Sequence, residues 1–196
     1  MRWQDYLRQG HIVVQGQRYD LGHLLAANVE INIDGNGGFP ARKITMHVEY
    51  LSHCVNVGAR SKDEPLDFEA LGHSRRMTDH QGQERAFCLD RYRWSKQLPA
   101  VIASLNDEVC YFGKHANWLV VRVIDDEGKE VQYSIYFRVR KGDAAGTLRM
   151  VIESAYERGA EKPSPGMPKN RKNKMRFKII AAKTLRGEAL RHPDSA

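Results

Sequence analysis

Two side chains suited to proton transfer lie close together in an apolar segment of this sequence. His47 and Glu49 are two residues apart within Lys43–Val57, whose alternating apolar residues predict a long strand. Residues i and i+2 of a strand share one face and lie about 7 Å apart. An imidazole and a carboxylate at this spacing could act together on one bound group, either in acid–base chemistry or on a metal ion.

A metal site is the weaker of these two interpretations. His53 shares the face of His47 but lies about 20 Å further along an unbroken strand, and Cys54 points to the opposite face. Zinc spacings such as C-x-x-C and H-x-x-x-H are absent from the segment. The glycine cluster Asp34–Gly38 has no following Lys-Ser/Thr and fits a turn better than a phosphate loop. The sequence therefore predicts neither a metal nor a cofactor.

Cleavage of RNA without a metal needs fewer fixed spacings, because the 2′-hydroxyl of the RNA is itself the nucleophile. The protein supplies a base, an acid and cations that hold the phosphate. We expect His47 or Glu49 to act as base, and Tyr156 or His115 as acid. The full set of candidate catalytic residues is His47, Glu49, His115, Arg138, Ser154, Tyr156, Arg176 and Lys178.

The charge distribution favours a polyanionic partner. The chain carries 31 Lys and Arg against 24 Asp and Glu, a formal net charge of +7. The whole excess lies after residue 156, most densely in Lys169–Lys178, which has six basic residues and no acidic one. Such a block on a neutral domain is typical of nucleic-acid binding, although basic tails are often only solvated. The candidate nucleic-acid contacts, with RNA favoured, are Lys169, Arg171, Lys172, Lys174, Arg122, Arg140 and Arg149.

The second half of the chain predicts a four-stranded antiparallel meander. Short links rich in Gly and Asp separate four apolar or alternating segments, which are Val109–Phe112, Trp118–Ile124, Val131–Arg140 and Leu148–Tyr156. One predicted face is apolar, and the other carries Tyr136 and arginines. A helix from about Lys96 to Leu105, with Pro99 in its first turn, has an apolar stripe that would cover the apolar face. The fold class is therefore α+β, with one main helix on an antiparallel sheet.

The remaining segments are predicted from composition. Residues 1–57 read as a strand-rich extension of the domain, and residues 58–86 as a flexible loop. Three prolines and two glycines make 157–168 a linker between the 1–156 domain and a basic segment, 169–196. Within that segment, Phe177–Ala182 reads as a last strand.

The order of helix, meander and late basic segment resembles the barnase/RelE/colicin-type ribonuclease superfamily, in the versions carried by mobile elements. The resemblance covers about half of the chain, is one of architecture, and takes Leu148–Tyr156 as the central strand. It implies that Ser154, Tyr156 and a basic residue such as Arg176 or Lys178 line the site. The first ninety residues have no counterpart in a minimal toxin of this type.

We therefore expect an RNA-directed cytoplasmic protein, with metal-independent endoribonuclease activity as a toxin or mobile-element effector. No apolar run approaches the 18 residues of a membrane span, and three widely spaced cysteines do not suggest a disulfide framework. One alternative is a non-enzymatic module that binds nucleic acid or a protein complex, such as a phage-encoded inhibitor or an accessory subunit. Another is an adaptor whose basic tail docks on an acidic protein. A binder would retard RNA and leave it intact.

Overall fold

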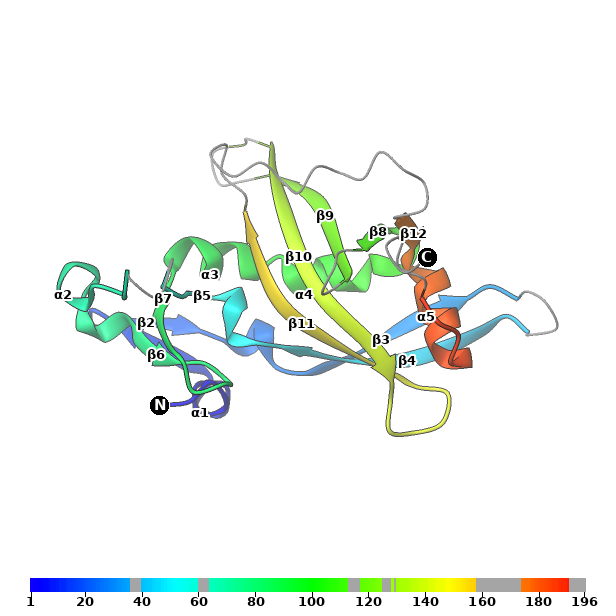
Figure 1. The fold of residues 1–196 in the computed structure, drawn as a ribbon, viewed down its shortest axis with the longest axis horizontal. Coiled ribbons are helices and arrows are strands. Elements are labelled where there is room, and N and C mark those ends of the chain that lie inside the picture. Colours follow the sequence, from blue (N-terminus) through cyan, green and yellow to red (C-terminus); the bar gives the residue numbers. More distant parts are fainter. Residues whose placement is uncertain are drawn as a thin grey trace.

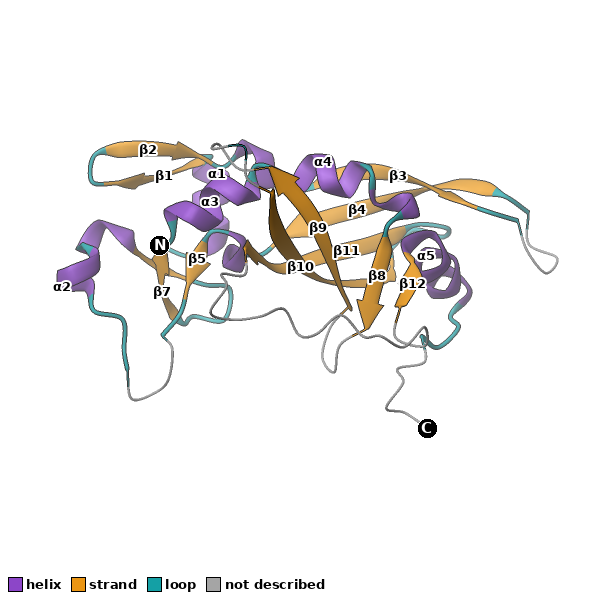
Figure 2. Ribbon diagram, turned by 90° about the horizontal axis from the view of Figure 1, so that it is seen from above, coloured by secondary structure: helices purple, strands orange, loops and turns teal. Residues whose placement is uncertain are grey.

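The computed structural model describes residues 1–35, 40–59, 64–112, 117–124, 128, 130–157 and 174–190. Within these ranges the chain forms a mixed α+β fold with three sheets, whose neighbouring strands are mostly antiparallel (Figure 1, Figure 2). The helices are α1 (Trp3–Gln9), α2 (Phe68–Leu71), α3 (Leu89–Ser95), α4 (Leu98–Ala103) and α5 (Phe177–Arg186). The 3₁₀ turns are η1 (Gly22–Leu24), η2 (Ser52–Cys54), η3 (His73–Arg75) and η4 (Leu105–Asp107). The strands are β1 (His11–Val14), β2 (Gln17–Asp20), β3 (Ala27–Ile33), β4 (Arg42–Tyr50), β5 (Asn56–Val57), β6 (Arg76–Thr78), β7 (Glu84–Phe87), β8 (Val109–Phe112), β9 (Asn117–Ile124), β10 (Glu130–Lys141), β11 (Leu148–Glu157) and β12 (Lys174–Arg176).

The large sheet has seven strands in the order β12-β8-β9-β10-β11-β4-β3. Strands β8 to β11 form the predicted antiparallel meander, and their bounds agree with the predicted ones to within one residue. Strand β4 adds to the meander parallel to β11, and β3 pairs antiparallel with β4. The two halves of the chain therefore share one sheet.

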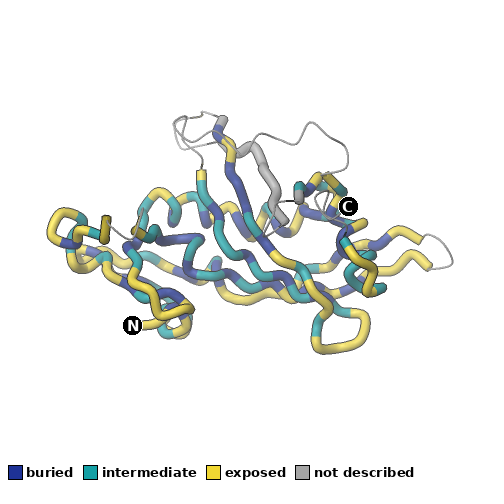
Figure 3. The backbone as a smooth tube through the Cα atoms, viewed as in Figure 1, coloured by how far each residue is buried: buried dark blue, intermediate teal, exposed yellow. Residues whose placement is uncertain are grey.

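The core lies on one face of this sheet, where strand alternation directs the apolar side chains. Helix α5 packs on β3 and β10, α4 packs on β3, and α3 packs against β11. In Figure 1, β10 and β11 cross in front of α3 and α4. The buried side chains of the two central strands include Tyr133, Ile135, Phe137, Leu148, Met150 and Ile152. Figure 3 shows buried positions along the middle of the molecule and exposed ones at its hairpin tips. The predicted apolar sheet face is thus confirmed.

The helix predicted from about Lys96 to Leu105 is present as α4, but it is shorter than predicted, and the 3₁₀ turn η4 continues the chain from Leu105. The separate short helix α3 precedes it and was not predicted. Helix α3 ends at Ser95, and α4 begins at Leu98 with Pro99 in its first turn, where a missing N–H costs no hydrogen bond. Leu98, Ile102 and Leu105 of the predicted stripe are fully buried. The stripe was therefore right, while the helix that carries it is shorter.

The predicted last strand, Phe177–Ala182, is also wrong. Within the described residues 174–190, Lys174–Arg176 pairs with β8, and the chain then forms α5. Phe177, Ile180 and Ala181 are buried at helical spacing, and Gly187 ends the helix in the left-handed conformation, with φ 76°. An amphipathic period of 3.6 residues thus fits this segment better than alternation does.

The segment 50–87 differs from both predictions made for it. The strand that starts at Arg42 ends at Tyr50, and η2 turns the chain away. Residues 58–86, predicted as a flexible loop, contain α2, η3, β6 and most of β7 within the described part. Strands β5, β7 and β6 form a small antiparallel sheet whose side chains Met77 and Phe87 join the core. Few alternating apolar residues mark such short strands, which explains why composition suggested a loop.

The packing around His23 makes stability depend on pH. Its Nε2 lies 2.8 Å from Oγ of Ser95, and this hydroxyl donates to the carbonyl of Tyr92, so His23 is the donor in the first hydrogen bond. Burial lowers the pKa of His23; the charge of Asp20 opposes this shift and that of Lys96 adds to it. Because the unfolded chain then takes up the proton more readily, we expect the free energy of unfolding to fall as the pH drops below about 6.5.

A His23→Gln variant should lose this part of the pH dependence. Urea unfolding of wild type and variant at about pH 7 and pH 5 measures it, and the variant is expected to lose less stability between the two. An equal loss in both proteins would show that His23 does not contribute.

Candidate nucleic-acid interface

The face of the seven-stranded sheet that points away from α4 and α5, which we call the open face, carries seven of the fifteen predicted site residues. Alternation along β4, β10 and β11 places polar side chains opposite the buried ones. A bulge between Tyr136 and Phe137 of the β10–β11 pair makes Glu153 an extra residue of β11. Ser154 and Tyr156 therefore lie on the same face as Tyr136. The open face therefore presents His47, Glu49, Tyr136, Arg138, Arg140, Arg149, Ser154 and Tyr156.

One end of the open face brings an imidazole, a carboxylate and a guanidinium together. Pairing aligns Asn28, His47, Arg149 and Arg140 on four adjacent strands. The Nε and Nη2 groups of Arg149 donate to both carboxylate oxygens of Glu49, at 2.6 to 3.1 Å. The hydrogen bonds from Arg149 to Glu49 raise the pKa of the guanidinium. We call His47, Glu49 and Arg149 the His47 cluster.

The orientation of His47 is set by its neighbour on β3. Its Nδ1 lies 3.0 Å from Oδ1 of Asn28, and its Nε2 lies 3.6 Å from Oε1 of Glu49. An amide oxygen can only accept, so Nδ1 carries the proton and the Nε2 lone pair of the neutral ring is left for another proton. The side chain of His47 is 46% exposed, which leaves the imidazole accessible from solvent.

The other end of the open face is aromatic. The rings of Tyr136 and Tyr156 are stacked, with centroids 5.7 Å apart and planes 17° from parallel. Backbone pairing continues from Ser154 through Tyr136 and Trp118 to Tyr111 and then to Lys174. This pairing crosses five strands, and we use the name aromatic row for the three tyrosines at this end whose side chains are described, Tyr111, Tyr136 and Tyr156.

Arg91 of α3 fixes one member of this end. Its guanidinium carbon lies 4.7 Å from the ring centroid of Tyr156, and Nη1 donates to the backbone carbonyls of His53 and Asn56 at 2.8 Å each. Burial lowers the pKa of Arg91. A partly buried cation held by two carbonyls orients the tyrosine ring. Sequence reasoning missed Arg91, because nothing in a short helix distinguishes it from its basic neighbours.

The structure does not bring the predicted base together with Tyr156, one of the two predicted acids; the other, His115, lies outside the described residues. Arg149 pairs with His47, whereas Tyr156 lies seven residues further along β11, about 20 Å away by strand rise. His47 and Tyr156 therefore cannot act on one phosphate. Between the two ends, Arg138 forms an ion pair with Glu153, which is the extra residue of the bulge.

The predicted basic residues of the C-terminal region lie in two places. Lys174 and Arg176 are exposed on the edge strand β12. Lys178 lies on α5 and pairs with Asp34 at 2.8 Å and Asp107 at 3.2 Å. It lines a cavity of about 500 Å³ with Ile33, Asp34, Gly35, Arg176, Ile179, Ala182 and Arg186. Lys178 thus forms ion pairs with two acidic residues on another part of the molecule, and it does not belong to the His47 cluster.

Several predicted contacts lie outside the described residues. These are His115, Lys169, Arg171 and Lys172. The backbone of Arg122 pairs with Gln132 of β10, and its side chain is not described.

A second polar cluster lies away from the large sheet and joins η2 to the turn between β6 and β7. It contains His53, Asp79 and His80, whose nearest nitrogen and oxygen atoms all lie within 4.8 Å of one another. Burial raises the pKa of Asp79, but hydrogen bonds from Gln83, His53, Arg85 and Gln81 outweigh it and lower the pKa to about 2. Sequence reasoning separated His53 from any partner because it continued the strand past Tyr50.

The cysteines take no part in either cluster. Cys54 and Cys110 are buried, and Cys88 is partly buried; none forms a disulfide. Burial raises the pKa of Cys54 to about 12, so this thiol stays protonated and unreactive. Cys54 and Cys110 thus act as small apolar residues of the core.

Comparison with known proteins gives a family and no function. No helix in the described ranges is long and apolar enough to cross a membrane. No curated protein and no solved structure matches the chain. The sequence profile of the YjaZ family matches residues 11–185, which include every described strand and most of α5. This chain therefore belongs to the YjaZ family.

Proposed function

We propose that this protein is RNA-directed, and that its open face binds single-stranded RNA and cleaves it without a metal ion at the His47 cluster. One observation carries the proposal: an oriented histidine, a carboxylate and arginines share one exposed sheet face with an aromatic row. The exposed Lys174 and Arg176 extend the positive charge to the sheet edge, and the basic segment 169–196 is proposed to contact the RNA backbone.

Binding would rest on the aromatic row and on the arginines beside it. Bases of single strands stack on aromatic rings, and this stacking is tolerant of sequence. Arg138 and Arg140 are exposed on β10, within two and four residues of Tyr136. Their guanidinium groups can therefore reach phosphates of a strand whose bases contact the row.

Cleavage would use the lone pair of His47. Nε2 takes the proton of a ribose 2′-hydroxyl while O2′ attacks the adjacent phosphorus and the bond from phosphorus to O5′ breaks. The departing O5′ takes a proton from water, so the products are a 2′,3′-cyclic phosphate and a 5′-hydroxyl. Glu49 stabilises the imidazolium from 3.6 Å, and Arg149 and Arg140 offset the charge on the phosphate oxygens. Glu49 is bound by Arg149 at both oxygens, which favours His47 over Glu49 as the base.

The test is incubation of the untagged protein with a labelled single-stranded RNA in EDTA, read on denaturing and native gels. We expect fragments with cyclic-phosphate ends, and RNA retardation that weakens steeply with salt. Retarded but intact RNA would contradict cleavage and indicate a non-enzymatic binding module. Absence of retardation at low salt would contradict RNA binding altogether.

Tyr136→Ala tests the binding surface separately. Loss of one stacking ring should weaken RNA affinity about 5- to 150-fold, measured by fluorescence anisotropy with a short labelled oligonucleotide. Tyr6→Ala is the control, because Tyr6 is also a partly buried tyrosine but lies on helix α1, outside the large sheet. Equal affinities for wild type and Tyr136→Ala would remove the aromatic row from the interface.

A further inference from the structure

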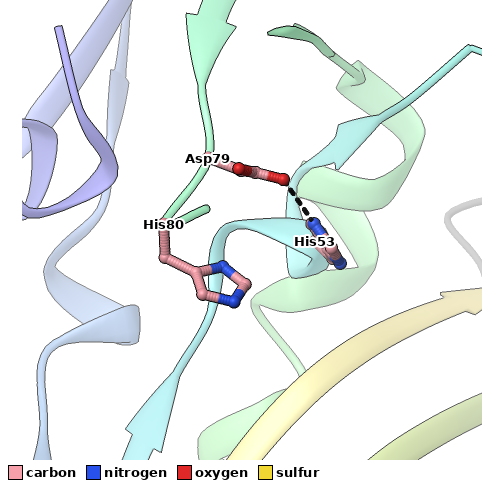
Figure 4. A group of neighbouring side chains, drawn as sticks. All are labelled: His53, Asp79 and His80. Atoms are coloured by element: carbon pink, nitrogen blue, oxygen red, sulfur yellow. Dashed lines mark hydrogen bonds and ion pairs between the residues drawn. The ribbon is translucent and has the colours of Figure 1, made fainter. Parts of the chain in front are cut away.

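The cluster at the turn between β6 and β7 has the side chains of a transition-metal site. His53 comes from η2, while Asp79 and His80 come from the tight turn after β6 (Figure 4). In Figure 4 the ring of His80 and the carboxylate of Asp79 both face the side of the turn on which His53 lies. Two imidazoles and one carboxylate are a common three-ligand set for Zn²⁺ and similar ions.

Asp79 is held rigidly for such a role. Its side chain is fully buried, and Oδ1 accepts from the backbone N–H groups of Gln81 and Gln83 at 2.8 and 2.9 Å. Oδ2 accepts from Nε of Arg85 at 3.0 Å and from Nε2 of His53 at 3.1 Å. Of these four donors, only the imidazole can exchange its proton for a metal ion.

The spacing of His53 and Asp79 fits that exchange. Two ligands about 2.0 to 2.1 Å from a tetrahedral zinc ion lie about 3.3 Å apart, and Nε2 of His53 lies 3.1 Å from Oδ2 of Asp79. A metal ion would therefore need little movement of either group.

His80 supplies the third nitrogen from the surface. It is exposed, and no hydrogen-bond partner for its ring occurs in the part of the chain that the structure describes. Its ring centroid lies 5.7 Å from that of His53. Its ligand atom lies within 4.8 Å of those of His53 and Asp79, so a small rotation of the exposed side chain would bring three ligands onto one ion.

We propose that His53, Asp79 and His80 form a binding site for a divalent transition-metal ion of the zinc type, with water as the fourth ligand. Arg85 stays on Asp79 as an outer-sphere donor that orients the carboxylate. Its positive charge makes the site weaker than a zinc site with four protein ligands. The EDTA-resistant cleavage proposed above does not use this ion.

The ion would tie the β6–β7 turn to η2 and thereby to the open face. The backbone carbonyl of His53 accepts from Arg91, whose guanidinium lies against Tyr156. Zinc binding would thus stabilise the segment that orients one ring at the aromatic end of the sheet. We expect thermal stability to rise with zinc even if RNA is never cleaved.

Titration calorimetry of untagged, EDTA-treated protein with ZnCl₂ tests the site. We expect one ion per chain, no displacement by excess Mg²⁺ because imidazole is a poor magnesium ligand, and a rise in Tm of about 5 to 10 °C at free zinc one hundred times Kd. His80→Ala should raise Kd at least tenfold without changing the metal-free Tm, since the residue is exposed. Co²⁺ should show the visible bands of tetrahedral coordination in wild type and lose them in His80→Ala.

His73→Ala is the matched control, because His73 is exposed and also lies near a carboxylate, 3.0 Å from Glu69. It should bind zinc like the wild type. The site is overturned if the wild type binds no zinc, or if His80→Ala and His53→Ala both bind it as tightly as the wild type does.

Discussion

A His47→Ala variant is expected to cleave RNA about 100- to 10 000-fold more slowly than the wild type, which is the range for loss of a general base. Asn28 fixes the proton of His47 on Nδ1, so the lone pair on Nε2 is the group that alanine removes. RNA affinity should change little, because Tyr136, Arg138 and Arg140 remain. Single-turnover cleavage rates, with anisotropy for affinity, separate the two effects.

The control for this variant is His11→Ala, because the ring of His11 also hydrogen-bonds to a neighbour, Gln9, but lies in the β1–β2 hairpin. It should keep full activity. Equal rates for His47→Ala and wild type would exclude His47 as the base. If the wild type binds RNA and leaves it intact, this comparison has no meaning and the protein is a binder.

Phe137→Ala is expected to lower the free energy of unfolding by about 3 to 5 kcal/mol. Phe137 is fully buried on β10, and its ring meets that of Phe177 on α5 edge-on, with centroids 6.0 Å apart. Alanine removes this contact and leaves a cavity where the helix packs on the central strand. Urea unfolding followed by far-UV circular dichroism measures the change.

Val13→Ala serves as the comparison for Phe137→Ala. Val13 is 48% exposed on β1, and its truncation should change stability by at most about 0.5 kcal/mol. A loss below about 1 kcal/mol for Phe137→Ala would contradict the packing of α5 on the sheet.

Sequence patterns predicted the sheet better than the helices. The meander could be located because apolar residues alternate over long strands and short Gly- and Asp-containing links separate them. The segment Phe177–Ala182 contains consecutive apolar residues, and a run this short fits either a strand or a buried helix face. The structure shows that this segment is a helix, because Phe177 and Ile180 are buried on one side and Gly187 ends the helix.

For the candidate site, the sequence predicted which residues share a face but not how far apart they lie. Alternation was enough to put His47 beside Glu49, and Arg138 and Arg140 on the polar side. The parallel pairing of β4 with β11 sets the distance from His47 to Tyr156, and pairing between distant segments leaves no local pattern. The same is true of His53 and Asp79, which meet only because the chain turns after Tyr50.

The pairing of β4 with β11 also bears on how the chain folds during synthesis. The bridge from Glu49 to Arg149 spans 100 residues of sequence, so β4 emerges from the ribosome long before its partner. Until β11 arrives, the β3–β4 hairpin has an unpaired edge and an apolar face that includes Ile44, Met46 and Val48. Folding must then close this long loop late, which slows it and exposes the nascent chain to aggregation. A fragment that ends before residue 148 should therefore require a chaperone to stay in solution.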